Sequence, residues 1–254
     1  MCIRDSPDCT PAHIDHMRFI GMGGAAVPAA VVDRATREGI SIVRMYGSTE
    51  HPSITGSLHT DPEQARGYSD GRPLPGVEIR LVDEEGAEVP TGEPGEILSR
   101  GPDCCAGYTD PALTEAAFDA DGWFHTGDVG VLDEDGCLHI TDRLKDIIIR
   151  GGENVSAVEV EEVVARVPGV AEVVVVAAPD DRYGERVCAV VRPADPAAPP
   201  TLEALRAAVG DAGLARQKWP EQLVVVDDLP RTPSGKVQKA VLRRRLATDA
   251  TLGA

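Results

Sequence analysis

One stretch decides the fold class of this chain: MRFIGMGGAAVPAAVVDRATREGISIVRMYGSTE at residues 17–50. The apolar run at 17–20 enters a glycine cluster, a helical stretch follows from Pro28 to about Arg37, and a second apolar run at 40–45 ends in a polar loop. The order strand, glycine turn, helix, strand and loop predicts an α/β layer with a parallel sheet.

In residues 77–141 the hydrophobic pattern becomes that of short β-strands. Four short runs alternate or are apolar: VEIRLV at 77–82, GEILSR at 95–100, VGVLD at 129–133 and CLHIT at 137–141. The first and third lead into DEEG and DEDG, which are residue types that favour tight turns. This pattern predicts a small antiparallel, β-barrel-like unit.

Beyond Arg143 the pattern changes again. Ser156 with Glu159 has capping-box spacing, and Pro168 with Gly169 ends the predicted helix. Its apolar face would consist of Val160, Val163, Val164 and Val167. Further expected elements are strands at 146–150, 171–178, 186–191 and 221–227, a helix at 201–209, and a closing helix marked by Val241, Leu242 and Leu246. We therefore predict two domains, 1–142 and a compact α+β domain at 143–254.

Composition limits the possible partners and the compartment. The 254 residues carry 42 acidic and 25 basic side chains, and the net charge of −17 disfavours nucleic acid as a partner. Six cysteines without a CxxC pair indicate reduced thiols in a cytoplasmic protein. No apolar run reaches the roughly 18 residues of a transmembrane segment. A basic segment near the end could meet a small polyanion: Arg231, Lys236, Lys239, Arg243, Arg244 and Arg245.

The glycine cluster at 21–26 is the first candidate site. Gly21, Gly23 and Ala26 nominally satisfy the dinucleotide pattern, but no acidic residue ends the second strand to hold a ribose. Glycines at the end of a strand also let a flat ring approach the backbone. A tight turn without a ligand is the alternative.

The YGSTE segment at 46–50 follows a strand, at the edge where α/β folds bind ligands. Tyr46 could stack on a base, and Thr49 could donate to a phosphate or carboxylate oxygen. Glu50 could hold Mg²⁺ through its carboxylate oxygens. An ordinary polar loop is the alternative.

Two further segments carry charged candidates. GWFHTGD at 122–128 ends in Asp128, which could hold ribose hydroxyls or could simply stabilise a turn. DRLKD at 142–146 places Arg143 and Lys145 at the predicted domain boundary, where a hinge is plausible and surface ion pairing is the alternative.

The last candidate is Lys236 in PRTPSGK at 230–236. It is not a phosphate-binding Walker loop, because Pro230 takes the position of the first glycine and Val237 that of the magnesium-binding Ser or Thr. A lysine at the tip of a mobile loop could neutralise charge developing on phosphorus. A solvated loop lysine is the alternative.

Together, in this order, the five motifs resemble the core motifs of the adenylate-forming superfamily, specifically the acyl-CoA synthetases. The resemblance runs from about Arg18 to Arg245. It implies the carboxyl-terminal portion of a large AMP-binding domain, joined by a hinge to a small mobile domain. The implied activity is that of a ligase in fatty acid metabolism, which uses ATP to convert a carboxylate into acyl-AMP and then transfers the acyl group to CoA.

The resemblance also implies residue roles. Gly24, Ala25, Tyr46 and Gly47 belong to the adenine segments, Thr49 contacts the α-phosphate side, and Glu50 binds Mg²⁺. Asp128 and Arg143 hold the ribose, and Lys145 is the hinge residue. Gly151 and Gly152 lie where the pantetheine thiol of CoA approaches. Lys236 bridges the substrate carboxylate and the α-phosphate during adenylation.

The family's phosphate loop has no counterpart before Gly21, and the opening MCIRDSPDCT matches no family segment. We therefore expect a carboxyl-terminal fragment that is inactive by itself. Two alternatives stay open: an adenylating enzyme that delivers the acyl group to a carrier protein, and a noncatalytic nucleotide-binding module. An aliphatic or alicyclic acid is the expected substrate class.

Overall fold

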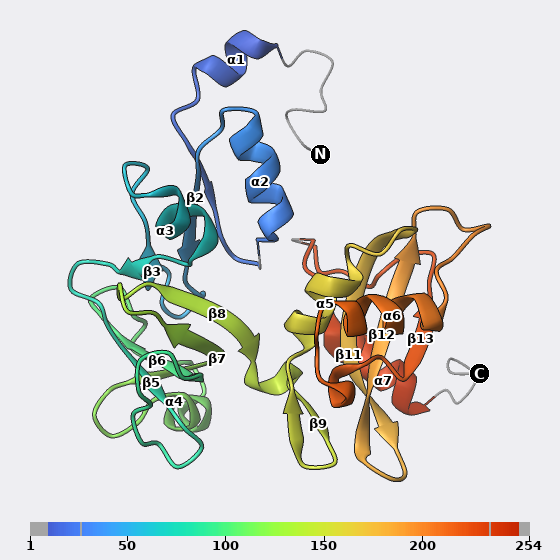
Figure 1. Ribbon diagram of the computed structural model, residues 1–254. Coiled ribbons are helices and arrows are strands. Elements are labelled where there is room, and N and C mark those ends of the chain that lie inside the picture. The colour runs from blue at the N-terminus through green and yellow to red at the C-terminus, as the bar shows by residue number, and fades with distance from the viewer. Residues whose placement is uncertain (1–9, 26, 234, 249–254) are drawn as a thin grey trace. The chain divides into compact units, whose positions relative to one another are not determined.

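The computed structural model describes residues 10–25, 27–233 and 235–248 (Figure 1). The unassigned opening at 1–9, Ala26 of the glycine pattern and Ser234 of the Lys236 loop lie outside these ranges. The chain divides into two compact units, Met1–Ile140 (unit 1) and Thr141–Ala254 (unit 2). The domain boundary proposed from the sequence, after residue 142, lies two residues beyond this division.

The first sheet of unit 1 contains the α/β layer. Its strands are β1 (Ile20–Met22), β2 (Ile42–Tyr46), β3 (Thr55–Gly56) and β4 (Arg72–Pro73), in that order. The helices are α1 (Pro11–Asp15), α2 (Ala29–Arg37) and α3 (Glu63–Tyr68). β1 and β2 are parallel as predicted, whereas β2–β3 and β3–β4 are antiparallel, so the sheet is mixed. The first strand is Ile20–Met22 rather than the apolar run at 17–20, and it extends into the glycine cluster because Gly21 and Met22 pair with β2.

The second sheet of unit 1 is the predicted antiparallel unit. It runs in the order β5 (Glu78–Val82), β6 (Gly95–Arg100), β7 (Phe124–Leu132) and β8 (Leu138–Arg143), and α4 spans Pro111–Ala117. Among the described strands the sheet is open, and no barrel closes. Most of the GWFHTGD motif lies inside β7, so Asp128 is a strand residue and not a turn acid. The β6–β7 register shifts opposite this segment, between Glu96 and Leu98.

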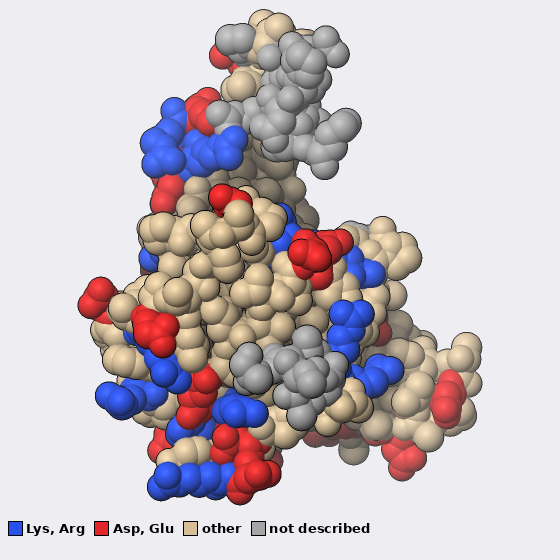
Figure 2. Space-filling view, turned by 90° about the vertical axis from the view of Figure 1, so that its right-hand side faces the viewer, with Lys and Arg blue, Asp and Glu red and all other residues tan. Residues whose placement is uncertain are grey.

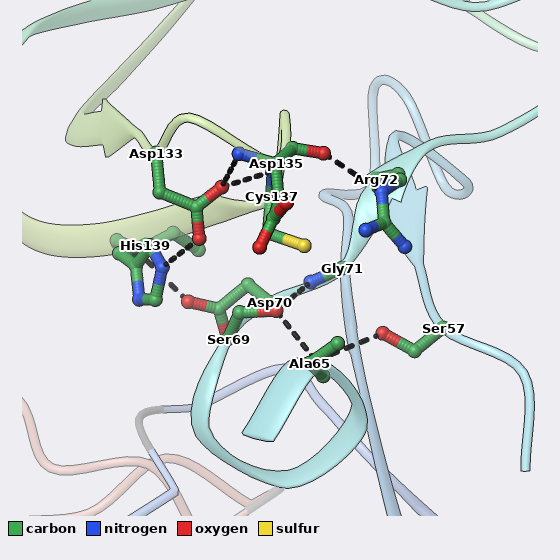
Figure 3. A network of polar contacts seen from close by, with 11 residues as sticks. Ser57, Ala65, Ser69, Asp70, Gly71, Arg72, Asp133, Asp135, Cys137 and His139 are labelled. Atoms are coloured by element: carbon green, nitrogen blue, oxygen red, sulfur yellow. Dashed lines mark hydrogen bonds and ion pairs between the residues drawn. The ribbon is translucent and has the colours of Figure 1, made fainter. Parts of the chain in front are cut away.

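Polar contacts connect the end of β4 to the turn before β8 (Figure 3). Arg72 Nε donates to the Asp135 carbonyl at 2.9 Å. Asp133 accepts hydrogen bonds from the backbone of Asp135 and Cys137 at 3.0 and 2.8 Å, and its Oδ2 lies 2.9 Å from His139 Nε2. Burial by itself raises the pKa of Asp133, but the hydrogen bonds from His139 and from the Cys137 backbone outweigh it, so the pKa is lowered. An ionised Asp133 therefore fixes this turn.

Asp70 connects β2 to β8. Its Oδ1 accepts two bonds from Arg44, at 3.1 Å from Nε and 2.6 Å from Nη2, and its Oδ2 accepts the Ile140 backbone N–H at 2.9 Å. The Asp70 and Leu138 backbones add a further bond of 2.7 Å. Since both charged side chains are nearly buried, the pair is screened little by solvent.

We expect Asp70→Ala to destabilise unit 1 by about 3–5 kcal/mol, because the change leaves the Arg44 guanidinium buried without its partner. Urea unfolding is followed by Trp123 fluorescence in a Trp219→Phe background, since these are the only two tryptophans. Glu78→Ala is the matched control: its pair with Arg100 is exposed, at 60% and 42%, and should contribute about 0–1 kcal/mol. Equal effects of the two changes would show that Asp70 has no special structural role.

Unit 2 is an α+β domain around one five-stranded sheet. Its strands are β9 (Ile148–Arg150), β10 (Glu153–Val155), β11 (Val170–Asp180), β12 (Gly184–Pro193) and β13 (Gln222–Val225). The order is β10-β9-β12-β11, and β13 pairs with β12 in parallel. The helices are α5 (Ala157–Val164), α6 (Leu202–Asp211) and α7 (Lys239–Thr248), with short turns η2 (Leu144–Asp146) and η3 (Arg216–Lys218). The two long strands, β11 and β12, fall at the predicted positions and pair antiparallel.

Alternating residues of β11 and β12 build two cores. One face of the sheet packs on α5 and α6 through Val175, Val187, Val160 and Leu205, and the opposite face packs on α7 through Val174, Val176 and Leu242. The predicted capping box holds in part, since Ser156 Oγ accepts the Glu159 N–H at 3.1 Å and begins α5.

None of the helices within residues 10–25, 27–233 and 235–248 has the length and apolar character required to cross a bilayer.

Candidate functional site

The first candidates in unit 1 follow β1 and β2 at their carboxyl ends. A side chain at Gly23 would lie 2.6 Å from the Met45 carbonyl oxygen, so the chain passes directly over β2 here. Gly24 has φ +76 and open space beside its Cα, a conformation that glycine adopts without strain. Gly24 and Ala25 therefore present bare backbone at the edge where a parallel pair of strands ends.

Tyr46 and Asp128 are brought together from strands 82 positions apart in the sequence. The Tyr46 hydroxyl donates to Asp128 Oδ2 at 2.7 Å. Both residues are buried, with 8% and 3% exposure. The Thr126 hydroxyl also accepts the Asp128 backbone N–H at 3.1 Å. The bond fixes the Tyr46 ring and the carboxylate in one arrangement that neither motif reveals alone.

The loop after β2 is sharply folded. A Cβ at Gly47 would lie 2.1 Å from the Pro52 carbonyl oxygen, so only glycine fits where the loop returns on itself. Ser48 and His51 close the loop with two hydrogen bonds, Ser48 N to His51 O at 2.9 Å and His51 N to Ser48 Oγ at 3.1 Å. This turn leaves the Thr49 side chain exposed and Glu50 partly exposed.

Glu50 is held by the segment that follows β6. Its carbonyl accepts the Cys105 N–H at 2.7 Å, and its Oε1 accepts the Tyr108 hydroxyl at 2.9 Å. Burial and the bond to Glu50 raise the pKa of Tyr108, which keeps the phenol protonated as a donor. The position of the Glu50 carboxylate therefore depends on residues more than 50 positions away.

His51 is a residue of this site that the sequence motifs do not point to. It is fully buried, its Nδ1 lies 2.9 Å from Ser99 Oγ, and its Nε2 lies 3.1 Å from Asp103 Oδ1. Burial lowers its pKa below the ordinary 6.5, although Asp103 opposes the shift. The neutral imidazole anchors the loop that presents Thr49 and Glu50. No local signal could have identified it, because its partners follow about 50 residues later.

Glu50 was predicted to bind Mg²⁺. Within the described residues no group of three or more His, Cys, Asp or Glu side chains could hold a metal by itself. A single partly exposed carboxylate nevertheless fits the way Mg²⁺ is bound together with substrate phosphates, through one or two carboxylates and several waters. Glu50 is therefore the residue that would hold the ion, and the phosphates would supply the remaining charged ligands.

Arg143 and Lys145 lie in unit 2, at the turn η2. The Arg143 N–H donates to Asp142 Oδ1 at 2.7 Å, and the Ile147 N–H donates to the Arg143 carbonyl at 3.1 Å. Asp142 is only 4% exposed, whereas the Arg143 and Lys145 side chains are exposed. Neither of these two bonds uses the Arg143 or Lys145 side chain, and both cationic side chains lie at the surface.

Gly151 and Gly152 form the two-residue turn between β9 and β10. Their φ values of +61 and +87 match a turn that requires positive φ at both central positions. The Gly151 N–H donates to the Tyr183 carbonyl at 2.8 Å. Arg150 lies 4.0 Å above the Tyr183 ring and forms a bidentate pair with Glu221, and this pair raises its pKa. The turn therefore exposes a strip of backbone on a rigid support.

Lys236 lies on the returning arm of its loop rather than at the tip. The Thr232 N–H donates to the Lys236 carbonyl at 2.8 Å, and the Lys236 N–H donates to Thr232 Oγ1 at 3.1 Å. Arg231 closes the loop by donating to the Gly235 carbonyl at 2.9 Å and by pairing with Glu172. The Lys236 side chain itself is exposed.

The basic segment near the end of the chain is therefore partly used inside unit 2. Three of its six members form ion pairs: Arg231 with Glu172, Lys239 with Glu161 and Arg243 with Asp146. Lys236, Arg244 and Arg245 have exposed side chains. Only part of the segment is available to a polyanion.

The candidate residues belong to two units. Unit 1 contains Gly24, Ala25, Tyr46, Gly47, Thr49, Glu50 and Asp128, and unit 2 contains Arg143, Lys145, Gly151, Gly152 and Lys236. The structure directly joins Tyr46 to Asp128 and places Gly47, Thr49 and Glu50 on the adjoining loop.

Known proteins share this organisation. The sequence profile described as AMP-binding enzyme matches residues 1–109, and that described as AMP-binding enzyme C-terminal domain matches residues 159–236. The chain belongs to the AMP-binding, adenylate-forming enzyme superfamily, as its motifs indicated.

Similar relatives are named CoA ligases. The medium-chain fatty-acid–CoA ligase of Escherichia coli (strain K12) is 41% identical over 244 residues, which cover 94% of this chain and 43% of that protein. The 3-[(3aS,4S,7aS)-7a-methyl-1,5-dioxo-octahydro-1H-inden-4-yl]propanoyl:CoA ligase of Rhodococcus jostii (strain RHA1) is 42% identical over 246 residues, which cover 95% and 45%. The chain thus spans less than half the length of these relatives.

Solved structures agree with the fold. ATP-bound MatB from Rhodopseudomonas palustris superimposes with a TM-score of 0.86 at 37% identity, covering 94% of this chain and 48% of that one. The o-succinylbenzoate CoA synthetase MenE from Bacillus subtilis, in complex with its acyl-adenylate intermediate, gives 0.80 at 34% identity, covering 93% and 47%. The predicted fold class, an adenylate-forming α/β region with a small α+β domain, is confirmed.

Proposed function

We propose that this chain is the carboxyl-terminal part of an ATP-dependent acyl-CoA ligase, called the full-length ligase below. The observation that carries the proposal is the buried Tyr46–Asp128 bond, which joins two nucleotide-binding motifs of the family beside the loop of Thr49 and Glu50. The names of the relatives support a carboxylic acid and CoA as substrates. The resemblance to fatty-acid ligases supports a role in fatty acid metabolism.

The adenylation step uses residues of both units. Gly24, Ala25 and the Tyr46 ring line the adenine, and Asp128 with Arg143 holds the ribose hydroxyls. Thr49 donates to the α-phosphate side. Glu50 would hold Mg²⁺, which would supply positive charge beside the phosphates of ATP.

Lys236 acts where two anions must meet. The carboxylate oxygen attacks the α-phosphorus and pyrophosphate leaves, so a cation that touches both groups stabilises the transition state more than the separated reactants. The exposed ammonium on an ordered loop suits this role.

The second step transfers the acyl group. The CoA thiol attacks the carbonyl of acyl-AMP, forms the thioester and releases AMP. The exposed backbone of Gly151 and Gly152 suits a narrow approach for the pantetheine arm. Lys236 has no role in this step, so the small domain rotates about Lys145 and withdraws it.

The chain alone should adenylate poorly, since no Ser/Thr/Gly-rich phosphate loop precedes Gly21. A noncatalytic nucleotide-binding role would apply to this chain in isolation. We also propose a cytoplasmic location, supported by the free cysteines Cys104, Cys105, Cys137 and Cys188. Nucleic acid is not a proposed partner. On the face drawn in Figure 2, basic and acidic side chains are intermingled and form no broad basic patch.

The decisive experiment measures both half-reactions of the full-length ligase. We expect ATP–pyrophosphate exchange that depends on an added aliphatic or alicyclic acid, followed by thioester formation when CoA is supplied. Acyl transfer to a carrier protein but not to CoA would favour the alternative acceptor. An amide product would favour the chemistry named for McbA from Marinactinospora thermotolerans, an amide bond synthetase 38% identical to this chain. Absence of exchange with every acid class would reject the proposal.

A further inference from the structure

The helix α7 contacts the turn η2 through one side chain. Arg243 Nη1 donates to the Lys145 carbonyl at 2.9 Å and to Asp146 Oδ1 at 2.6 Å. The two charged side chains are largely buried, with 26% exposure for Arg243 and 12% for Asp146. We call this set of contacts the Arg243 clasp. It is a charge-assisted, partly desolvated contact, which is stronger than an exposed ion pair.

The clasp fixes the carboxyl side of the turn to the body of unit 2. Leu242, the neighbour of Arg243, is buried in the core between α7 and the sheet. Lys239 lies one helical turn earlier on the same face as Arg243 and pairs with Glu161 of α5 at 2.9 Å. The Lys145 carbonyl and Asp146 are therefore attached to a helix that is itself held at two further points.

The same helix begins next to the Lys236 loop. Gln238 connects the two, because its N–H donates to the Pro230 carbonyl at 2.8 Å and its Nε2 donates to the Arg231 carbonyl at 2.9 Å. The Val241 N–H then donates to the Gln238 carbonyl at 3.0 Å at the start of α7. Arg243 lies about one helical turn, roughly 6 Å, beyond Lys239, the first residue of α7.

We propose that Arg243 is a positioning residue that joins the hinge turn to the helix that follows the Lys236 loop, so that turn and lysine rotate as one rigid body. The change in backbone dihedral angles is then confined to the residues before the Lys145 carbonyl, because Arg243 holds the turn from that carbonyl onward. This inference rests on the proposed function, because it takes Lys145 as the hinge and Lys236 as the adenylating lysine. No ligand is required for the clasp itself.

The first test measures how far the Arg243 clasp protects the turn from opening. It needs no catalysis and uses the 254-residue chain. The endoproteinase Lys-C has only four lysines to cut, and the Lys145–Asp146 bond is the one that the clasp holds. Arg243→Gln should speed cleavage at Lys145 about tenfold relative to cleavage at Lys218, because the loss of charged hydrogen bonds lets the turn open. Amide exchange over residues 144–150 should quicken in parallel.

Arg244→Gln is the matched control, since Arg244 is the next residue of α7 and its side chain is exposed. It should leave both rates as in the unsubstituted chain. Arg243→Lys should restore most of the protection, since a single donor atom makes both contacts and an ammonium can replace it. This variant is read by amide exchange alone, because it adds a fifth lysine that Lys-C can cut. Far-UV circular dichroism verifies folding of each variant. Equal cleavage in the Arg243→Gln and Arg244→Gln chains would overturn the clasp.

The second test measures whether Arg243 affects the step assigned to Lys236, and it uses the full-length ligase. Arg243→Gln should lower kcat of pyrophosphate exchange about tenfold with KM for ATP unchanged, while thioester formation from supplied acyl-AMP stays within about twofold. A parallel fall in both half-reactions would overturn the link and indicate general destabilisation. Absence of exchange in the unsubstituted ligase would instead reject the proposed function, and the proteolysis result would still decide the clasp.

Discussion

Lys236→Ala is expected to reduce carboxylate-dependent pyrophosphate exchange of the full-length ligase by about 10²–10³-fold, the effect typical of removing one group that stabilises transition-state charge. The loop should keep its shape, because it is held by backbone bonds to Thr232 and by the Arg231 side chain rather than by the lysine ammonium. Thioester formation from supplied acyl-AMP should be retained. Separate assays of the two half-reactions measure the split.

The control for this change is Arg166→Ala, which removes an exposed cation of unit 2 outside the basic segment and should leave both half-reactions unaltered. If Lys236→Ala lowered exchange and thioester formation by the same factor, the lysine would not be specific to adenylation. If exchange survived unchanged, the assignment of Lys236 as the bridging cation would be wrong.

Asp128→Ala should weaken ATP binding by about 1.5–3 kcal/mol, the range for hydrogen bonds that involve a charged group. The carboxylate is held beneath the site by the Tyr46 hydroxyl, so its loss removes the ribose acceptor and also frees the Tyr46 ring. Titration calorimetry of the full-length ligase measures the dissociation constant of ATP. In the 254-residue chain, the affinity for AMP with and without Asp128→Ala gives the same comparison for the residues of unit 1.

Two variants separate these contributions. Asp128→Asn keeps the shape and an acceptor for Tyr46 but removes the charge, and Tyr46→Phe keeps the ring but removes the donor. Tyr46→Phe should cost about 0.5–1.5 kcal/mol, the value of an ordinary hydrogen bond, and therefore less than Asp128→Ala. An ATP affinity that is unaltered in Asp128→Ala would exclude this residue from ribose binding.

The local elements were predictable because their signals are local. The capping residue Ser156, the apolar spacing of Val160 and Val164, and the apolar run of the strand at 171–178 each follow from neighbours a few positions away. The sheet beyond β2 was not predictable, since β3 and β4 have two residues each and too little sequence to show a period. The sequence predicts a turn before Asp128 because a glycine precedes it, but Gly127, with φ +69, lies within β7 where the β6–β7 register shifts.

The candidate residues followed from family motifs, but the residues that hold them did not. His51 packs against Ser99 and lies beside Asp103, Glu50 accepts from Tyr108, and Arg243 reaches Lys145 and Asp146. Each of these contacts spans about 50 to 98 positions, and the residues that hold the motifs, Ser99, Asp103, Tyr108 and Arg243, lie outside all five motifs.

The sequence by itself determined the superfamily, the two-part organisation and the chemical types at the site, because motif order and residue periodicity are properties of the linear chain. Only the tertiary structure decided that Tyr46 and Asp128 share a buried hydrogen bond, that half of the basic segment is neutralised within unit 2, and that Arg243 clasps the hinge turn. The physical reason is that hydrogen bonds and ion pairs depend on distances in space of about 3 Å, which are set by how sheets and helices pack and not by separation along the chain.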